Sequence, residues 1–113
     1  MRREELYLAD IIEAADAIDH FLAQANKDTF VDDLLRSAVL HKLTVIGEAA
    51  SHLSKEFRDR HSEIEWADII GFRNVAVHSY FSVDWNIVWT TATEDVPKLR
   101  DQVAKIIDNE FSS

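Results

Sequence analysis

Turn-forming residues are scarce in this chain, and their scarcity limits the folds open to it. Only 2 glycines and 1 proline occur among its 113 residues. Because Gly and Pro punctuate tight turns, a many-stranded β fold is disfavoured. Ala, Leu and Glu are abundant and favour helices. We therefore expect an all-α protein, with a single domain over residues 1–113.

The N-terminal segment carries its apolar residues at helical spacing. Between residues 4 and 25 they recur at alternating steps of three and four: Leu8, Ile11, Ala15, Ile18, Leu22 and Ala25. A seam of this kind is typical of a helix that packs in a bundle. A first helix is expected here, ending near Asn26.

A longer second helix is expected from Thr29 to about Phe57. Thr29 and Asp32 resemble a capping box with Asp in place of the usual Glu or Gln. The helix would be about seven turns long and would form the backbone of a bundle. Gly47 lies in its interior, where glycine usually costs stability. This indicates that another helix or a ligand approaches closely at that point.

Shorter helices are expected in the second half of the chain. Ser62 and Glu65 have the spacing of a capping box for a helix over residues 63–77. Asp84 can cap a further helix that begins at Trp85.

Pro97 predicts a break or kink near Asp95, because proline removes a helical hydrogen bond. A final helix would then run to about Asn109. Its apolar face would consist of Leu99, Val103 and Ile106. The complete pattern predicts a four- to five-helix up-and-down bundle.

The net charge of −9 weighs against a general nucleic-acid coat, since phosphate binding depends on Lys and Arg clusters. The acidic surface could serve a basic partner or solubility. The absence of cysteine excludes disulfides and Cys-based zinc sites. No apolar run approaches the roughly 18 residues of a membrane span, and no signal peptide is recognisable. We expect a soluble cytoplasmic protein that does not bind membranes.

Arg73 is the residue that departs most clearly from helical patterning. On a regular helix it would lie within the apolar stripe formed by Trp66, Ile69, Ile70 and Val77. A guanidinium there must be paired or line a pocket, because a buried unpaired charge is costly. Either a functional cation or a structural ion pair with a buried carboxylate would satisfy this requirement.

His78 and its neighbours are the other candidates for chemistry. Asn74 and His78 are four residues apart and share a helix face. Arg73 and His78 lie about 140° apart on a regular helix. A helix end, the reach of Arg73 or pairing across a two-fold axis would have to bring them together. His78 could instead cap a helix C-terminus, and Tyr80 is expected just beyond the helix.

His41, Glu48 and His52 fall on one face of the expected second helix, and Glu48 and His52 are an i, i+4 pair. A metal site is conceivable for these residue types. The alternative is a solvated or interfacial polar stripe, which is the interpretation we favour. No metal or other cofactor is expected.

The motifs of this chain, in their order, resemble those of the HepT (DUF86) branch of the HEPN superfamily. They are Ile46-Gly47-Glu48-Ala49-Ala50, Ile64-Glu65-Trp66, Arg73-Asn74 with His78 and Tyr80-Phe81, Val88-Trp89, and Asp95-Val96-Pro97-x-Leu99. The resemblance covers nearly the whole chain. It implies a homodimeric helical bundle in which the Arg-x4-His motifs of two subunits meet in one interfacial cleft.

The resemblance also implies a function, namely a metal-independent endoribonuclease toxin of a toxin–antitoxin system. Arg73 and His78 would be its catalytic residues, with Asn74 in a supporting role. The chemistry is reasonable, since His can act as base or acid near neutral pH and Arg can hold phosphoryl oxygens. The partner would be an MntA-like minimal nucleotidyltransferase antitoxin, which silences the toxin by AMPylation of Tyr80.

Two other classes of function stay open. A non-catalytic HEPN helical module could bind nucleotide or RNA, or scaffold a nucleotidyltransferase, and the acidic charge favours this alternative. A plain dimeric interaction protein, in which Arg73 makes only a structural ion pair, is the third.

Overall fold

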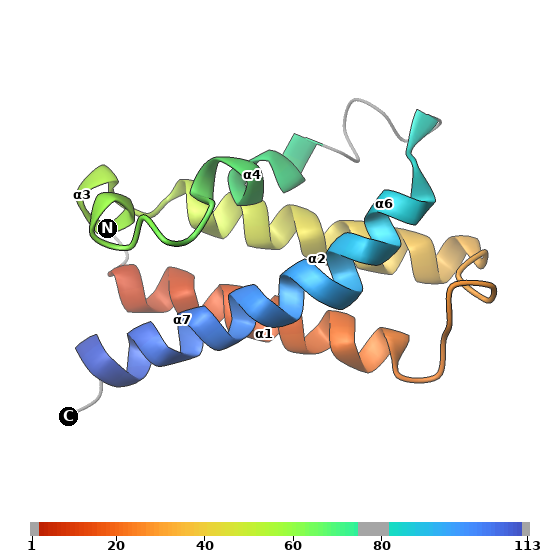
Figure 1. The fold of residues 1–113 in the computed structure, drawn as a ribbon, viewed down its shortest axis with the longest axis horizontal. Coiled ribbons are helices and arrows are strands. Elements are labelled where there is room, and N and C mark those ends of the chain that lie inside the picture. Colours follow the sequence, from red (N-terminus) through yellow and green to blue (C-terminus); the bar gives the residue numbers. More distant parts are fainter. Residues whose placement is uncertain (1–2, 75–81, 112–113) are drawn as a thin grey trace.

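The computed structural model describes residues 3–74 and 82–111, and every regular element among them is helical. The chain runs along the long axis of the molecule four times, in alternating directions (Figure 1). The elements, in order, are α1 (Glu4–Leu22), α2 (Asp33–Ser51), α3 (Lys55–Arg60), α4 (Trp66–Gly71), a 3-10 turn (Phe72–Asn74), α6 (Trp85–Thr90), a π-helical turn (Thr91–Asp95) and α7 (Val96–Glu110). The expected all-α, up-and-down arrangement is confirmed for this part of the chain.

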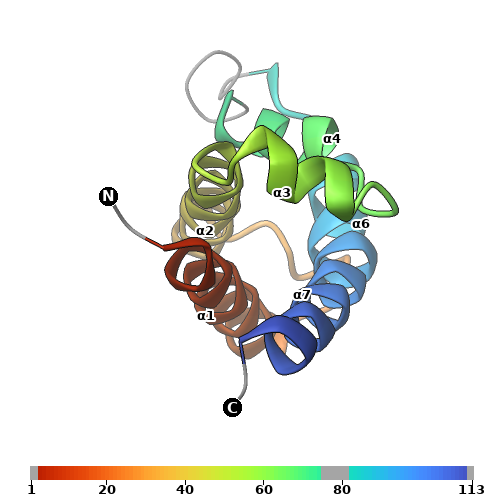
Figure 2. The ribbon, with the colours of Figure 1, turned by 90° about the vertical axis from the view of Figure 1, so that its left-hand side faces the viewer.

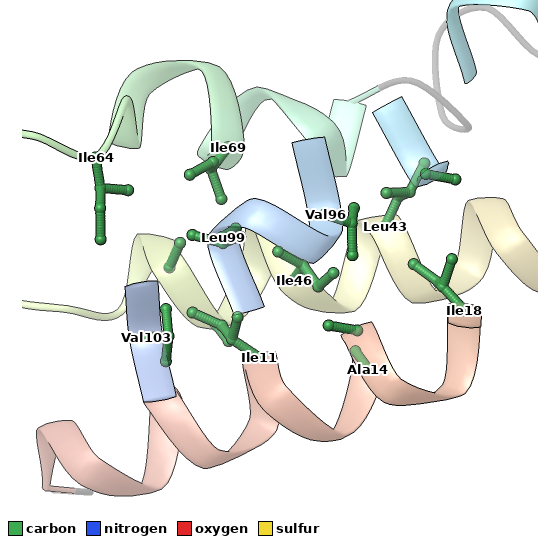
Figure 3. Packing of buried hydrophobic residues seen from close by; sticks show 14 of the residues in the cluster. Ile11, Ala14, Ile18, Leu43, Ile46, Ile64, Ile69, Val96, Leu99 and Val103 are labelled. Atoms are coloured by element: carbon green, nitrogen blue, oxygen red, sulfur yellow. The ribbon is translucent and has the colours of Figure 1, made fainter. Parts of the chain in front are cut away.

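The core lies between the four passes, which surround it when the molecule is seen end on (Figure 2). Apolar side chains from separate helices meet there, among them Ile11, Ile46, Ile69 and Leu99 (Figure 3). Leu99, Val103 and Ile106 on α7 are buried, as their spacing predicted. None of the described helices has the length and apolar character needed to cross a membrane.

α1 forms where its periodicity predicted, and it ends at Leu22 rather than near Asn26. The side chain of Asn26 then organises a turn, accepting a hydrogen bond from the Thr29 N–H at 3.0 Å. Thr29 therefore belongs to this turn, and its expected role as a helix cap is wrong. Asp32 caps α2 instead, because its carboxylate accepts from the Leu35 N–H at 2.9 Å.

The predicted continuation of the second helix to Phe57 is also wrong. α2 ends at Ser51, and the Ser54 hydroxyl accepts from the Phe57 N–H at 3.1 Å to begin a separate helix, α3. This local cap competes with continuation of the longer helix. The change of direction keeps both Leu53 and Phe57 buried.

The helix expected over residues 63–77 is shorter in its described part. α4 begins at Trp66 with Glu65 as its N-cap residue and has no side-chain cap, so the expected capping box is wrong. The start is fixed instead by the indole of Trp66, whose Nε1 donates to the His61 carbonyl at 3.0 Å. After Gly71 the chain tightens into the 3-10 turn, and residues 75–77 lie outside the described part.

α6 and α7 form a single rod that is interrupted by one π-helical turn. Asp84 caps α6 as predicted, accepting from the Asn86 N–H at 3.0 Å and the Ile87 N–H at 3.3 Å. The irregularity expected near Asp95 is the π turn. Pro97 follows the π turn directly, and the backbone before it stays helical. Because proline lacks an N–H and its ring crowds the preceding turn, it accounts for the irregularity.

The carboxylate of Glu110 joins the end of α7 to the end of α3. Arg60 Nη2 donates to Glu110 Oε1 at 2.6 Å, and His61 Nε2 contacts the other oxygen. Burial alone would raise the pKa of Glu110. Hydrogen bonds from Arg60 and His61, with their charges, outweigh burial and leave the pKa below its ordinary value.

We expect Glu110→Gln to lower the free energy of unfolding at pH 7 by up to about 1 kcal/mol, the range of partly exposed ion pairs. Because folding lowers the pKa of Glu110, its charge stabilises the fold above the unfolded pKa of about 4.3. That contribution disappears as pH falls through the lower folded pKa. Urea unfolding should therefore show the variant and the parent converging in acid, and Glu56→Gln on α3 is the control. A difference that is the same at every pH would contradict this account.

Candidate active site

Gly47 allows the main chain of Arg73 to pack directly on α2. A Cβ at Gly47 would lie 2.7 Å from the Arg73 backbone nitrogen, and 3.0 Å from the carbonyl oxygens of Ile69 and Ile70. These distances are too short for a real side chain, so only glycine permits the approach. The close approach predicted from this interior glycine is confirmed, and its partner is the end of α4 with the 3-10 turn.

The side chain of Arg73 pairs with Glu48, the residue that follows Gly47 on α2. Nη1 donates to Glu48 Oε2 at 3.4 Å, and the two side chains are 41% and 56% exposed. The expectation that Arg73 lies in a buried apolar stripe is therefore wrong. Arg73 follows the end of α4 in the 3-10 turn, and its long side chain extends from there to the exposed Glu48. The pair is also not the buried structural ion pair considered as the alternative.

The guanidinium of Arg73 retains donors for another ligand. It has five N–H donors, and Glu48 is its only hydrogen-bond partner in the described parts of the chain. A guanidinium can hold a phosphate through two parallel N–H bonds. A half-exposed Arg73 can therefore bind a phosphoryl group while it stays next to Glu48.

Glu48 divides its two carboxylate oxygens between two partners. Oε1 faces His52 Nε2 at 3.2 Å, and Oε2 faces Arg73. The His52 ring stacks on Tyr7 of α1, with ring centroids 5.1 Å apart and planes 14° apart. A continuous chain of contacts thus connects α1, the end of α2 and the 3-10 turn.

A shallow hollow of about 450 Å³ runs along the same face between α1 and α2. It is lined by Tyr7, Asp10, Thr44, Val45, Glu48, Ala49 and His52. Within residues 3–74 and 82–111, no group of three or more His, Asp or Glu side chains is placed to hold a metal ion. Of the three residues of the expected polar stripe, Glu48 and His52 line this hollow, and His41 is exposed on α2 outside it.

Two of the predicted site residues, His78 and Tyr80, lie outside the described residues, and their roles stay predictions. Asn74 is exposed and ends the 3-10 turn beside Arg73. The contact between Arg73 and Glu48 was not predicted, because the two residues come from separate helical passes. Its one signal in the sequence was the interior glycine next to Glu48.

The chain is similar to known proteins over most of its length. Residues 11–106 match the family model described as "Ribonuclease HepT-like". A candidate RNase of Caldanaerobacter subterraneus subsp. tengcongensis is 34% identical over 97% of this chain and 99% of its own length. "Probable ribonuclease HepT" of Thermococcus cleftensis is 34% identical over 93% of this chain and 96% of its own. A candidate RNase of Methanocaldococcus jannaschii is 32% identical over 90% and 94%, respectively. No solved structure matches the chain.

Proposed function

This chain belongs to the ribonuclease HepT-like family, and from that membership we propose that it is an endoribonuclease toxin that cuts RNA without a metal ion. Residues 1–113 would act as one HepT-like domain in the cytoplasm. The observation that carries the proposal is the half-exposed guanidinium of Arg73, which is held on α2 at both its main chain and its side chain. Arg73 is also the first residue of the Arg-x4-His motif.

In the proposed reaction the ribose 2′-oxygen attacks the adjacent phosphorus while a base takes its proton. The bond from phosphorus to the 5′-oxygen then breaks, and an acid gives that oxygen a proton. His78 can fill either role, because imidazole titrates near neutral pH. Arg73 would hold the phosphoryl oxygens as negative charge builds on them, and Asn74 would support it. The products are a 2′,3′-cyclic phosphate and a 5′-hydroxyl.

We propose that the active form is a homodimer, since one His from each protomer would supply both a base and an acid. An exposed apolar residue supports an interface close to Arg73. Ile87 is 64% exposed and lines a hollow together with Leu43 and Phe72, the neighbour of Arg73. Sedimentation of the purified protein would measure its oligomeric state.

The test of the proposed function is whether the purified protein cuts a defined RNA in the presence of EDTA. A non-catalytic module that binds nucleotide or RNA, or scaffolds a nucleotidyltransferase, is the second candidate, because the net charge of −9 weighs against the extensive RNA contact that a nuclease makes. That module would bind its ligand and leave the RNA intact. Cleavage that appears in EDTA supports the ribonuclease, whereas binding without cleavage supports the module.

The proposed antitoxin is an MntA-like nucleotidyltransferase, which would transfer AMP from ATP to the Tyr80 hydroxyl and release pyrophosphate. We expect co-expression with such an enzyme to raise the intact mass of this chain by one or more AMP groups and to stop RNA cleavage. Bulk and negative charge next to the site would exclude RNA. The chain has 2 tyrosines, so Tyr7→Phe is a matched control that should keep the modification. Modification that persists in Tyr80→Phe would contradict the assignment.

A further inference from the structure

We propose that Glu48 is a positioning residue that orients the Arg73 guanidinium for the scissile phosphate, an inference that rests on the proposed ribonuclease function. Two neighbouring residues of α2 act on Arg73. Gly47 receives its main chain, with the Arg73 nitrogen 2.7 Å from where a Cβ would lie, and Glu48 pairs with its side chain at 3.4 Å. One turn of α2 therefore contacts both the main chain and the guanidinium of Arg73.

The Glu48 carboxylate can direct Arg73 because it is itself held. His52 Nε2 lies 3.2 Å from Oε1, and the His52 ring is stacked on Tyr7. His52 thereby restrains the carboxylate through the oxygen that does not contact Arg73. An arginine side chain has many rotamers, and restraining them before RNA binds lowers the entropy that must be lost in the reaction.

A purely structural role fits the Glu48–Arg73 pair poorly. The side chains are 56% and 41% exposed, and exposed ion pairs of this kind contribute little to folding. The carboxylate also places a negative charge beside a cation that would bind RNA, which weakens phosphate binding. A positioning residue should therefore raise the cleavage rate while making substrate binding somewhat weaker.

The test compares Glu48→Ala with the native protein on a labelled RNA in EDTA. We expect kcat to fall about tenfold to a hundredfold, the usual effect of a misplaced catalytic group. KM should stay the same or fall, because a negative charge has been removed. Glu48→Gln keeps an oxygen for Arg73 and should recover most of the rate. Glu13→Ala, at an exposed position on α1, should behave as the parent.

Two further measurements separate this inference from the proposed function. In an Arg73→Ala background, Glu48→Ala should cause no additional loss, because Glu48 acts through Arg73. Independently of activity, NMR relaxation of the Arg73 Nε–H group should show more motion in Glu48→Ala than in Glu13→Ala. Unchanged motion, or a full additional loss in the double variant, would overturn the role of Glu48. An inactive parent in which Arg73 still loosens would instead contradict the ribonuclease.

Discussion

Arg73→Ala is expected to slow RNA cleavage by about a hundredfold to a thousandfold, the effect of removing one preorganised donor to a developing charge. The folded state should be little affected. Arg73 is 41% exposed and Glu48 keeps its contact with His52, so no buried charge is left unpaired. The free energy of unfolding should therefore change by less than about 1 kcal/mol.

Two companion variants make the Arg73 result specific. Arg73→Lys should recover only part of the rate, because an ammonium lacks the planar fork that holds two phosphoryl oxygens. His78→Ala should lose about a hundredfold to ten-thousandfold, the range for general acid–base groups. Single-turnover cleavage of a labelled RNA measures the rates, and urea unfolding measures stability. If Arg73→Ala cleaves RNA at the native rate, the assignment of Arg73 to the active site is wrong.

Gly47→Ala is the second change with a large expected effect, although it adds only a methyl group. The new Cβ would meet backbone atoms of Arg73, Ile69 and Ile70 at 2.7 to 3.0 Å, and backbone atoms cannot rotate away. The end of α4 must therefore move off α2. We expect a loss of about 1–3 kcal/mol in stability, as for other overpacked sites. Displacement of Arg73 should also lower cleavage about tenfold to a hundredfold.

Gly71→Ala is the matched control for Gly47→Ala, because both replace a glycine in or beside the same contact. A Cβ at Gly71 would meet nothing within 4 Å, and its backbone does not have positive φ. The control should keep the native rate and gain up to about 1 kcal/mol from reduced freedom of the unfolded chain. If the two variants prove equally stable and equally active, the packing of Arg73 on Gly47 has no functional consequence.

The helical periodicity was sufficient to predict the helices that build most of the core. Leu8 and Ile11 on α1, and Leu99 and Val103 on α7, are buried as their spacing indicated. Helix boundaries were harder to predict, because several residues near each boundary can cap the helix end. Thr29 and Asp32 were both candidates, and only the turn around Asn26 decided between them.

The geometry around Arg73 could be predicted only in part. Its place in the motif made Arg73 a candidate site residue, but a regular helix predicted a buried position for a side chain that is 41% exposed. The 3-10 turn that carries Arg73 packs against Gly47 of α2, a contact that a local sequence pattern does not encode. The Glu48 contact joins two separate passes of the chain and leaves no periodic signature.

The end groups of cleaved RNA test the central claim most directly. Purified protein should cut RNA in EDTA and leave a 2′,3′-cyclic phosphate on one fragment and a 5′-hydroxyl on the other, and Arg73→Ala should slow the appearance of both about a hundredfold to a thousandfold. Fragments with a 3′-hydroxyl and a 5′-phosphate, or cleavage that requires added divalent metal, would contradict a reaction driven by Arg73 and His78.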